Sequence, residues 1–157
     1  MPPQLLFDLS KIDLTRVEYD QEGVRRFNPQ RGDMEQLNGI IYTDRETHCV
    51  LGYKDVRADE FWVPGHVPGR PLYPGVLMIE AGAQVASFYT KALLGWEGFV
   101  GFGGLDDCKF RATVVPPCRL YLLAQRVYER HRRVQCRLQG VVNGSICFEA
   151  AITGAQL

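Results

Sequence analysis

The sequence lacks a long hydrophobic run, a net charge and a recognisable leader segment. No stretch reaches the roughly eighteen consecutive apolar residues that a membrane-spanning helix needs. The first residues have neither the basic start nor the apolar run of a signal peptide. Because 18 basic residues balance 18 acidic ones, the chain has no general attraction to nucleic acid. We therefore expect a cytoplasmic protein with no membrane and no nucleic acid among its partners.

Paired cysteines and nucleotide-binding glycine motifs are also missing. The five cysteines are scattered, with no C-x-x-C pair and no histidine at the spacing of a tetrahedral zinc site. This distribution favours reduced thiols in a cytosol. The chain has neither a G-x-G-x-x-G motif between a strand and a helix nor a P-loop. We expect no metal site and no cofactor.

Lysine is scarce, since 14 of the 18 basic residues are arginines. Five of the arginines fall close together late in the chain: Arg126, Arg130, Arg132, Arg133 and Arg137. A solvated hairpin is the ordinary interpretation of such a charge run, and docking of an acidic partner is the alternative.

Length and composition are those of an ordinary globular domain. The chain has 157 residues, of which 46% are hydrophobic and 23% are charged. Residues 8–27 mix apolar and charged side chains around Gly23, which indicates a short helix or a helical arm. We predict one domain over residues 1–157, with residues 1–30 as an N-terminal arm or short helix.

Two strand-like runs precede the middle of the chain, and four follow it. Residues 37–43 and 47–56 are joined by a short polar turn, as in a β-hairpin. The later runs cover residues 99–108, 120–128, 134–142 and 146–152. Asn143-Gly144 joins the last two and accepts the positive φ angles of a type I′ hairpin turn.

A rigid loop and one apolar helix lie between these groups of strands. Proline and glycine are so dense over residues 64–75 that no regular element is compatible with them. Val76 to Leu94 is apolar nearly all round, which is typical of a buried helix. Gly82 inside it is tolerable only if something packs closely there. The order predicts an α+β protein in which an antiparallel sheet curls around one long central helix.

Three residues around the loop and the helix start form a candidate catalytic group. His66 lies in the rigid loop, although a lone loop histidine is commonly a surface residue. Glu80 lies among apolar helix residues, and burial would raise its pKa and favour the protonated form that a general acid needs. Its alternative role is a favourable interaction with the helix dipole. The Gly75 N–H at the helix start could stabilise a developing oxyanion.

The segment from Gly65 to Gln84 resembles the 3-hydroxyacyl-[acyl-carrier-protein] dehydratases of the FabZ type. This family carries the pattern G-H-F-P-G-x-P-x-x-P-G-V-L-x-x-E-x-x-x-Q, and the chain has GHVPGRPLYPGVLMIEAGAQ. Residues 102–116 also resemble the family's G-I-D-x-x-K-F-R-x-x-V-x-P-G-D stretch. The resemblance covers about residues 30–154 and implies a hot-dog fold.

The resemblance also implies the reaction and the residues that perform it. His66 would remove or return the C2 proton, and Glu80 would protonate the departing C3 hydroxyl. The Gly75 N–H would polarise the thioester carbonyl, with Val76 beginning the same helix. In this family the histidine and the glutamate come from opposite subunits of a homodimer, which is often assembled further into a trimer of dimers.

The substrate implied by the resemblance is an acyl chain on acyl carrier protein. The acyl chain would lie in an apolar tunnel along the dimer interface. We assign five residues to this tunnel: Val67, Pro68, Tyr73, Gln84 and Phe102. Because acyl carrier protein is acidic, we expect basic residues to dock it, with these candidates: Lys109, Arg111, Arg132 and Arg133.

Some residues depart from the family's pattern. Val67 and Tyr73 replace the usual Phe and Met, residues 115–118 read V-P-P-C in place of V-P-G-D, and residues 31–38 match R-Y-P-F-L-L-x-D only loosely. These departures indicate a divergent branch that could serve a specialised acyl pathway. The alternatives are a hot-dog thioesterase and a non-catalytic acyl-binding subunit, but the retention of His66 and Glu80 favours dehydration.

Overall fold

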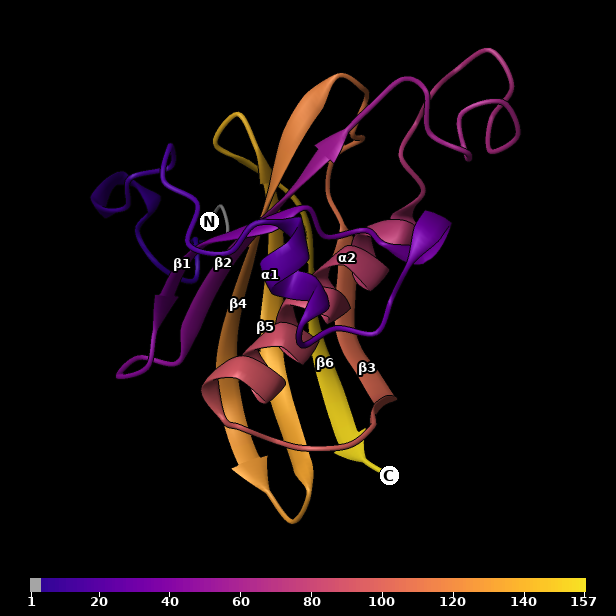
Figure 1. The fold of residues 1–157 in the computed structure, drawn as a ribbon. Helices are drawn as coiled ribbons and strands as arrows, with labels where there is room; N and C mark the ends of the chain where they lie inside the picture. The colour runs from indigo at the N-terminus through magenta and orange to yellow at the C-terminus, as the bar shows by residue number, and fades with distance from the viewer. Residues whose placement is uncertain (1–3) are drawn as a thin grey trace.

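A six-stranded antiparallel sheet curls around helix α2 in the computed structural model, which describes residues 4–157 (Figure 1). The strands are ordered β1-β2-β4-β5-β6-β3 across the sheet. Their bounds are β1 Gly39–Asp44, β2 Cys49–Val56, β3 Val100–Phe110, β4 Cys118–Arg130, β5 Arg133–Val142 and β6 Ser145–Gln156. Helix α2 covers Gly75–Phe88. The predicted architecture of two strands, a loop, a helix and four strands is confirmed.

The hairpin turns follow the local sequence as predicted. Asn143 and Gly144 have φ angles of 50° and 78°, and Val142 pairs with Ser145 across the turn. β1 and β2 pair as the antiparallel hairpin expected from residues 37–56. The strand ends differ from the predicted ends by only a few residues. β4 and β6 are longer than predicted, because their backbones stay paired with β5 beyond the apolar runs.

The predicted helix over residues 76–94 changes its geometry in its last turn. Beyond α2 the chain continues as a π-helical turn, η3, over Tyr89–Leu93. The Leu94 N–H bonds to the Tyr89 carbonyl, five residues back, and the chain then leaves the helix at Gly95, whose φ is 72°. Apolar spacing does not distinguish this wider turn from an α-helical one, so the sequence could not predict it.

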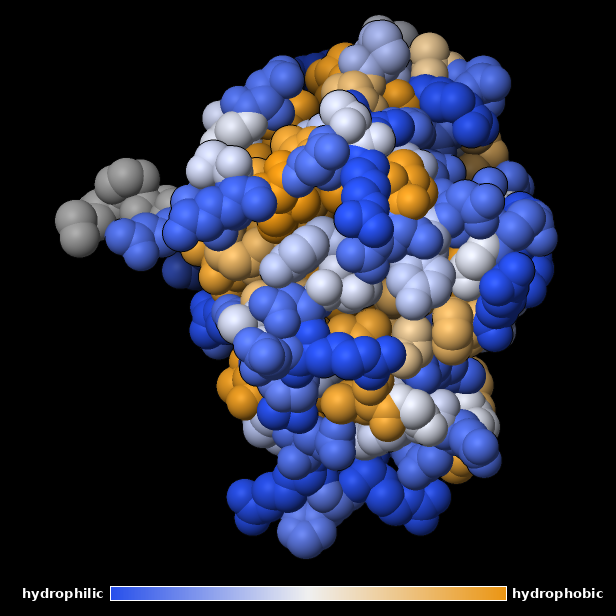
Figure 2. Space-filling model, turned by 60° about the vertical axis from the view of Figure 1, so that its left-hand side comes forward, coloured by the Kyte–Doolittle hydropathy of each residue, from blue (hydrophilic) through white to orange (hydrophobic). Residues whose placement is uncertain are grey.

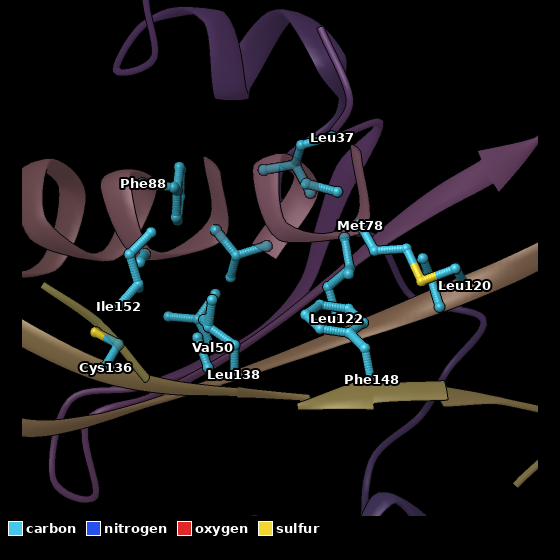
Figure 3. Close-up of a cluster of buried hydrophobic side chains, with 14 of the residues drawn as sticks. Leu37, Val50, Met78, Phe88, Leu120, Leu122, Cys136, Leu138, Phe148 and Ile152 are labelled. Carbon is cyan, nitrogen blue, oxygen red and sulfur yellow. The ribbon is translucent and has the colours of Figure 1, made fainter. Parts of the chain in front are cut away.

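The main core lies between α2 and the inner face of the sheet, where the buried side chains of Figure 3 meet. Gly82 shows how closely the two layers approach: a Cβ on it would lie 2.9 Å from Leu138 Cδ1 and 3.3 Å from the Phe148 ring. The expectation that something packs closely on Gly82 is therefore confirmed. Fully burying a Leu or Phe side chain stabilises the fold by about 1.5–3 kcal/mol.

A second apolar cluster lies on the other face of the sheet. Strand neighbours such as Leu122 and Leu123 belong to opposite clusters, because alternate side chains point to opposite faces. The N-terminal segment covers this outer cluster with these residues: Leu5, Leu6, Phe7, Leu9, Ile12 and Leu14. The buried Gln139 side chain ties the segment down by accepting from the Leu6 N–H and donating to the Gln4 carbonyl, both at 2.8 Å.

Helical structure near the N-terminus is limited to short pieces. A 3-10 turn, η1, covers Leu9–Lys11, and a single α-helical turn, α1, covers Gln21–Arg25. The remainder of residues 8–27 is an irregular segment that is held by side-chain contacts, and α1 is a short helix within the range where one was expected. No helix within residues 4–157 is long and apolar enough to span a membrane.

Candidate active site

A cavity of about 240 Å³ lies between one face of α2 and the edge strand β3. The helix contributes Glu80, Ala83 and Ser87, whose spacing of three and four residues places them on one side. Ala86 of the helix also lines the cavity. The rest of the wall comes from the loop before β1, from η3, from the residue before β3, and from β3, β5 and β6: Pro29, Gln30, Thr90, Lys91, Phe99, Val100, Gly101, Phe102, Val134, Cys136, Ile152, Thr153 and Gly154. These residues follow the helix from Glu80 to Lys91, and the wall is more apolar than polar.

Glu80 places a carboxyl group at one end of this cavity. Burial raises its pKa, and a hydrogen bond from Gln84 opposes part of that rise. The group therefore keeps its proton to a higher pH than an exposed glutamate does. This is the property that the sequence predicted for Glu80, and it is the state in which a carboxyl can donate a proton.

His66 lies on the loop that precedes α2, with its side chain exposed. Its Nδ1 is 2.8 Å from the Leu72 carbonyl oxygen, and because a carbonyl oxygen only accepts, Nδ1 is the donor. This contact leaves the Nε2 lone pair free to accept a proton, which is the tautomer that a general base needs. The loop itself is held by a Tyr73 N–H bond of 2.8 Å to the Val114 carbonyl and by the buried Trp62.

Gly75 begins α2 next to these groups. The Leu77 and Met78 N–H groups make the first helical bonds, both to the Pro74 carbonyl. The Gly75 and Val76 N–H groups come before these bonds and are available to another acceptor. A Cβ on Gly75 would lie 2.8 Å from the ring of the exposed Phe110, so a larger residue at this helix start would displace that ring.

His66 and Glu80 do not line the same cavity in this chain. Within residues 4–157, His66 is not among the side chains that line the cavity containing Glu80. The open side lies toward β3, an edge strand with no buried residue. Large apolar side chains are exposed on and beside it, with 72% of Val76, 58% of Phe102 and 53% of Phe110 accessible. They form an apolar surface that this chain leaves open to solvent.

The five residues predicted for the tunnel are in three different environments. Phe102 lines the cavity, whereas Val67 and Pro68 lie on the His66 loop. Tyr73 and Gln84 are buried and do not line this cavity, so the structure of one chain leaves their place in the tunnel a prediction.

Tyr73 and Gln84 both form hydrogen bonds to the segment that precedes β1. The Gln84 Oε1 accepts from the Gln36 N–H at 3.0 Å, and its Nε2 donates to the Met34 carbonyl at 2.6 Å. The Tyr73 hydroxyl donates to Gln36 Oε1 at 2.7 Å. The motif places Gln84 on the helix but does not identify its hydrogen-bond partners. Gln84 bonds Gln36, which lies 48 residues earlier in the chain.

The predicted basic residues fall into two groups. Lys109 and Arg111 are at the end of β3, where Arg111 pairs with Glu149. Arg132 and Arg133 are at the tip of the β4–β5 hairpin, which projects beyond the sheet (Figure 1). Figure 2 shows hydrophilic residues gathered at that end of the molecule.

A buried ion pair beneath the His66 loop was not anticipated. Lys54 lies on the inner face of β2 and pairs with Glu60, with side-chain exposures of only 4% and 6%. Glu60 also accepts from the Arg57 N–H at 2.8 Å, which fixes the start of the loop. The sequence offers two signals for this ion pair: a lysine within the otherwise apolar strand 49–56, and an acid six residues after it. Among residues 4–157, no cluster of three or more His, Cys, Asp or Glu side chains is arranged to hold a metal.

The FabA-like domain family matches residues 28–151. A protein called 3-hydroxyacyl-[acyl-carrier-protein] dehydratase FabZ from Sorangium cellulosum is 35% identical over 118 residues, covering 70% of this chain and 76% of that protein. A protein with the same name from Desulfotalea psychrophila is 30% identical over 142 residues, covering 88% and 94%.

Solved structures with this fold have much lower sequence identity. The dehydratase heterocomplex ApeI:P from Xenorhabdus doucetiae aligns with a TM-score of 0.71 at 14% identity, covering 85% of this chain and 90% of that chain. The virulence protein Cj0977 from Campylobacter jejuni aligns with a TM-score of 0.65 at 17% identity, covering 85% and 95%. These likenesses concern the fold alone, which is the α+β hot-dog fold expected from the sequence.

Proposed function

The chain belongs to the FabA-like family as a FabZ-type dehydratase, and from that premise we propose that it converts 3-hydroxyacyl-[acyl-carrier-protein] reversibly to the trans-2-enoyl thioester. The reaction belongs to fatty acid biosynthesis or a related acyl pathway. The observation that carries the proposal is the Glu80 carboxyl, whose pKa is raised by burial at the end of an apolar cavity. A protonated carboxyl in that position can supply the proton that turns a hydroxide into a leaving water molecule.

In the proposed mechanism the acid and the base act on neighbouring carbons. The Nε2 of His66 takes the proton from C2, and the electron pair of that C–H bond forms the C2–C3 double bond. The C3–O bond breaks as Glu80 protonates the oxygen, and water leaves. The Gly75 N–H holds the thioester oxygen while enolate charge develops. Hydration of the enoyl thioester is the same sequence reversed.

The active unit in this proposal is a homodimer, in which His66 of one subunit faces Glu80 of the other. Two observations support it: His66 is outside the Glu80 cavity, and β3 leaves its edge unpaired with Phe102 and Phe110 exposed. An exposed edge strand with apolar side chains is a surface suited to pairing with a second chain. Further association into a trimer of dimers is part of the same proposal.

Acyl carrier protein is the proposed partner, and the whole chain is proposed to act as one hot-dog domain. The exposed Lys109, Arg111, Arg132 and Arg133 supply positive charge for an acidic partner. The five unpaired cysteines support a cytoplasmic location, where thiols stay reduced. Thioesterase activity is not favoured, because the thioesterase-titled neighbour from Streptococcus pneumoniae is only 11% identical.

The test is conversion of enoyl thioesters by the purified protein, followed by the loss of enoyl absorbance and by release of free thiol. We expect hydration of crotonyl and longer enoyl thioesters with no thiol release. Thiol release without loss of the enoyl group would favour the thioesterase, and no change in either signal would contradict catalysis.

A further inference from the structure

Lys54 and Glu60 form the one ion pair within residues 4–157 whose two side chains are both less than a tenth exposed. Lys54 lies on the inner face of β2, on the same side as the core residues Val50 and Val56. Taking two charges out of water costs so much free energy that a well-packed apolar pair is often equally stable or more stable. Stability alone therefore does not explain this pair, whereas its contacts with the neighbouring loop offer a reason.

The Glu60 carboxylate fixes the start of the long loop that joins β2 to α2 and carries His66 (Figure 1). One of its oxygens accepts from Lys54 Nζ, and the other accepts from the Arg57 N–H at 2.8 Å. Two residues after Glu60, the Trp62 carbonyl accepts from the His66 N–H at 2.9 Å. The start of the loop therefore connects the backbone of His66 to the buried ion pair.

The Lys54 ammonium also lies beside the end of the same loop. Its Nζ is 5.8 Å from the centre of the Tyr73 ring, a distance at which an ammonium and an aromatic face attract each other. The Tyr73 ring packs against the Trp62 ring with 5.3 Å between their centres, and both side chains are buried. Tyr73 follows Leu72, whose carbonyl holds the His66 ring at 2.8 Å. Lys54 thus interacts with both ends of the loop, and each end holds one part of His66.

We infer that Lys54 and Glu60 are positioning residues, whose ion pair ties the two ends of the loop together and sets the place and direction of the His66 ring. This inference rests on the proposed function, because it concerns how the proposed base is held. Hydrogen bonds are directional and are stronger in a buried, low-dielectric setting, whereas apolar contacts are non-directional. A misplacement of about 1 Å can lower the rate of an enzyme by about a hundredfold. An exposed histidine on an irregular loop needs such an anchor.

The test compares two double variants of the full chain, Lys54→Met/Glu60→Gln and Arg119→Met/Asp55→Asn. The second is the matched control, because Asp55 is next to Lys54 on β2, points to the opposite face, and pairs with Arg119 at 2.8 Å. Hydration of an N-acetylcysteamine enoyl thioester gives kcat and KM, and chemical denaturation gives the free energy of unfolding. Nitrogen NMR of labelled histidine reports which ring nitrogen of His66 carries the proton.

We expect Lys54→Met/Glu60→Gln to fold, since it replaces two buried charges with neutral side chains of similar size. Its kcat should fall about tenfold to a hundredfold, because the base is displaced. Its KM should stay nearly unchanged, since the cavity proposed to hold the acyl chain is not lined by this pair. The His66 ring should no longer be held as a single Nδ1–H tautomer, whereas the control variant should keep both kcat and the tautomer.

Glu60→Asp provides a second readout if the double variant does not fold. This change retains both charges but shortens the acid by one methylene, so the carboxylate cannot keep the same geometry with Lys54 and the Arg57 N–H. We expect a smaller fall in kcat, with KM again nearly unchanged.

The outcomes distinguish this inference from the function on which it rests. An unaltered kcat in the folded double variant, or in Glu60→Asp where the double variant does not fold, would overturn the positioning role and leave dehydration intact. A fall in kcat without a change in the His66 tautomer, or an equal fall in the control variant, would overturn it as well. No hydration by the unaltered protein would overturn the proposed function and this inference with it.

Discussion

The loop over residues 64–74 and helix α2 each carry one proposed catalytic group, but in opposite environments. Glu80 is on a helix enclosed by its own sheet, and that enclosure alone raises its pKa. His66 is exposed, and its ring is fixed by one bond to Leu72. A single chain therefore encloses the proposed acid, whereas it leaves the proposed base open to solvent; in the proposed dimer, the second subunit would cover the loop.

The largest expected effect comes from removing either group. Glu80→Gln and His66→Ala should each lower kcat for enoyl hydration by about 10²–10⁴-fold, because each deletes one proton transfer. His66→Ala should leave the free energy of unfolding nearly unchanged, since its side chain is exposed. Absorbance kinetics and chemical denaturation measure the two quantities. Full activity in either variant would contradict its role.

Mixing the two inactive variants sharpens the comparison between loop and helix. If His66 and Glu80 meet across two subunits, half of the randomly formed dimers are mixed and each has one intact site. A refolded equal mixture should regain about a quarter of the unaltered activity. Each variant refolded alone is the control. No recovery in a mixture shown to contain mixed dimers would mean that the two groups come from the same chain.

The pH dependence should reflect the enclosed environment of Glu80. Because burial raises its pKa, the carboxyl stays protonated above the ordinary value of 4.5 and loses its proton only as the pH rises through the raised value. In the range where Glu80 limits the reaction, kcat/KM for dehydration should fall about tenfold per pH unit above that pKa. Carbon NMR of the labelled carboxyl gives the pKa directly, and a result at or below 4.5 would contradict the enclosed environment.

Two glycines provide the mildest test of the same comparison. Gly82→Val should destabilise the protein by about 1–3 kcal/mol, because the added side chain would press against Leu138 in the core. Gly65→Ala should change stability by less than about 1 kcal/mol, because no atom lies within 4 Å of the added Cβ on the loop. Chemical denaturation measures both values, and equal losses would contradict the contrast in packing.

Local patterns predicted most of the fold. Strand alternation, the Asn143-Gly144 turn and the apolar helix each follow from neighbouring residues, and so does the partly buried setting of Glu80. The environments of Gln84 and Gln30 do not, because both depend on a segment that crosses α2 from far away in the sequence. The pairing of Lys54 with Glu60 also requires the loop to fold back under itself, which no periodicity encodes.

The N-terminal segment has a practical consequence for work on this protein. The family match begins at residue 28, whereas residues 5–14 cover the apolar outer cluster around Leu51 and Leu123. A chain shortened to the matched region would present that bare patch to water and to other molecules, which favours aggregation. Helix α2, which carries the proposed acid Glu80, is on the opposite face of the sheet. The solubility of the protein therefore depends on N-terminal residues that take no part in the proposed chemistry.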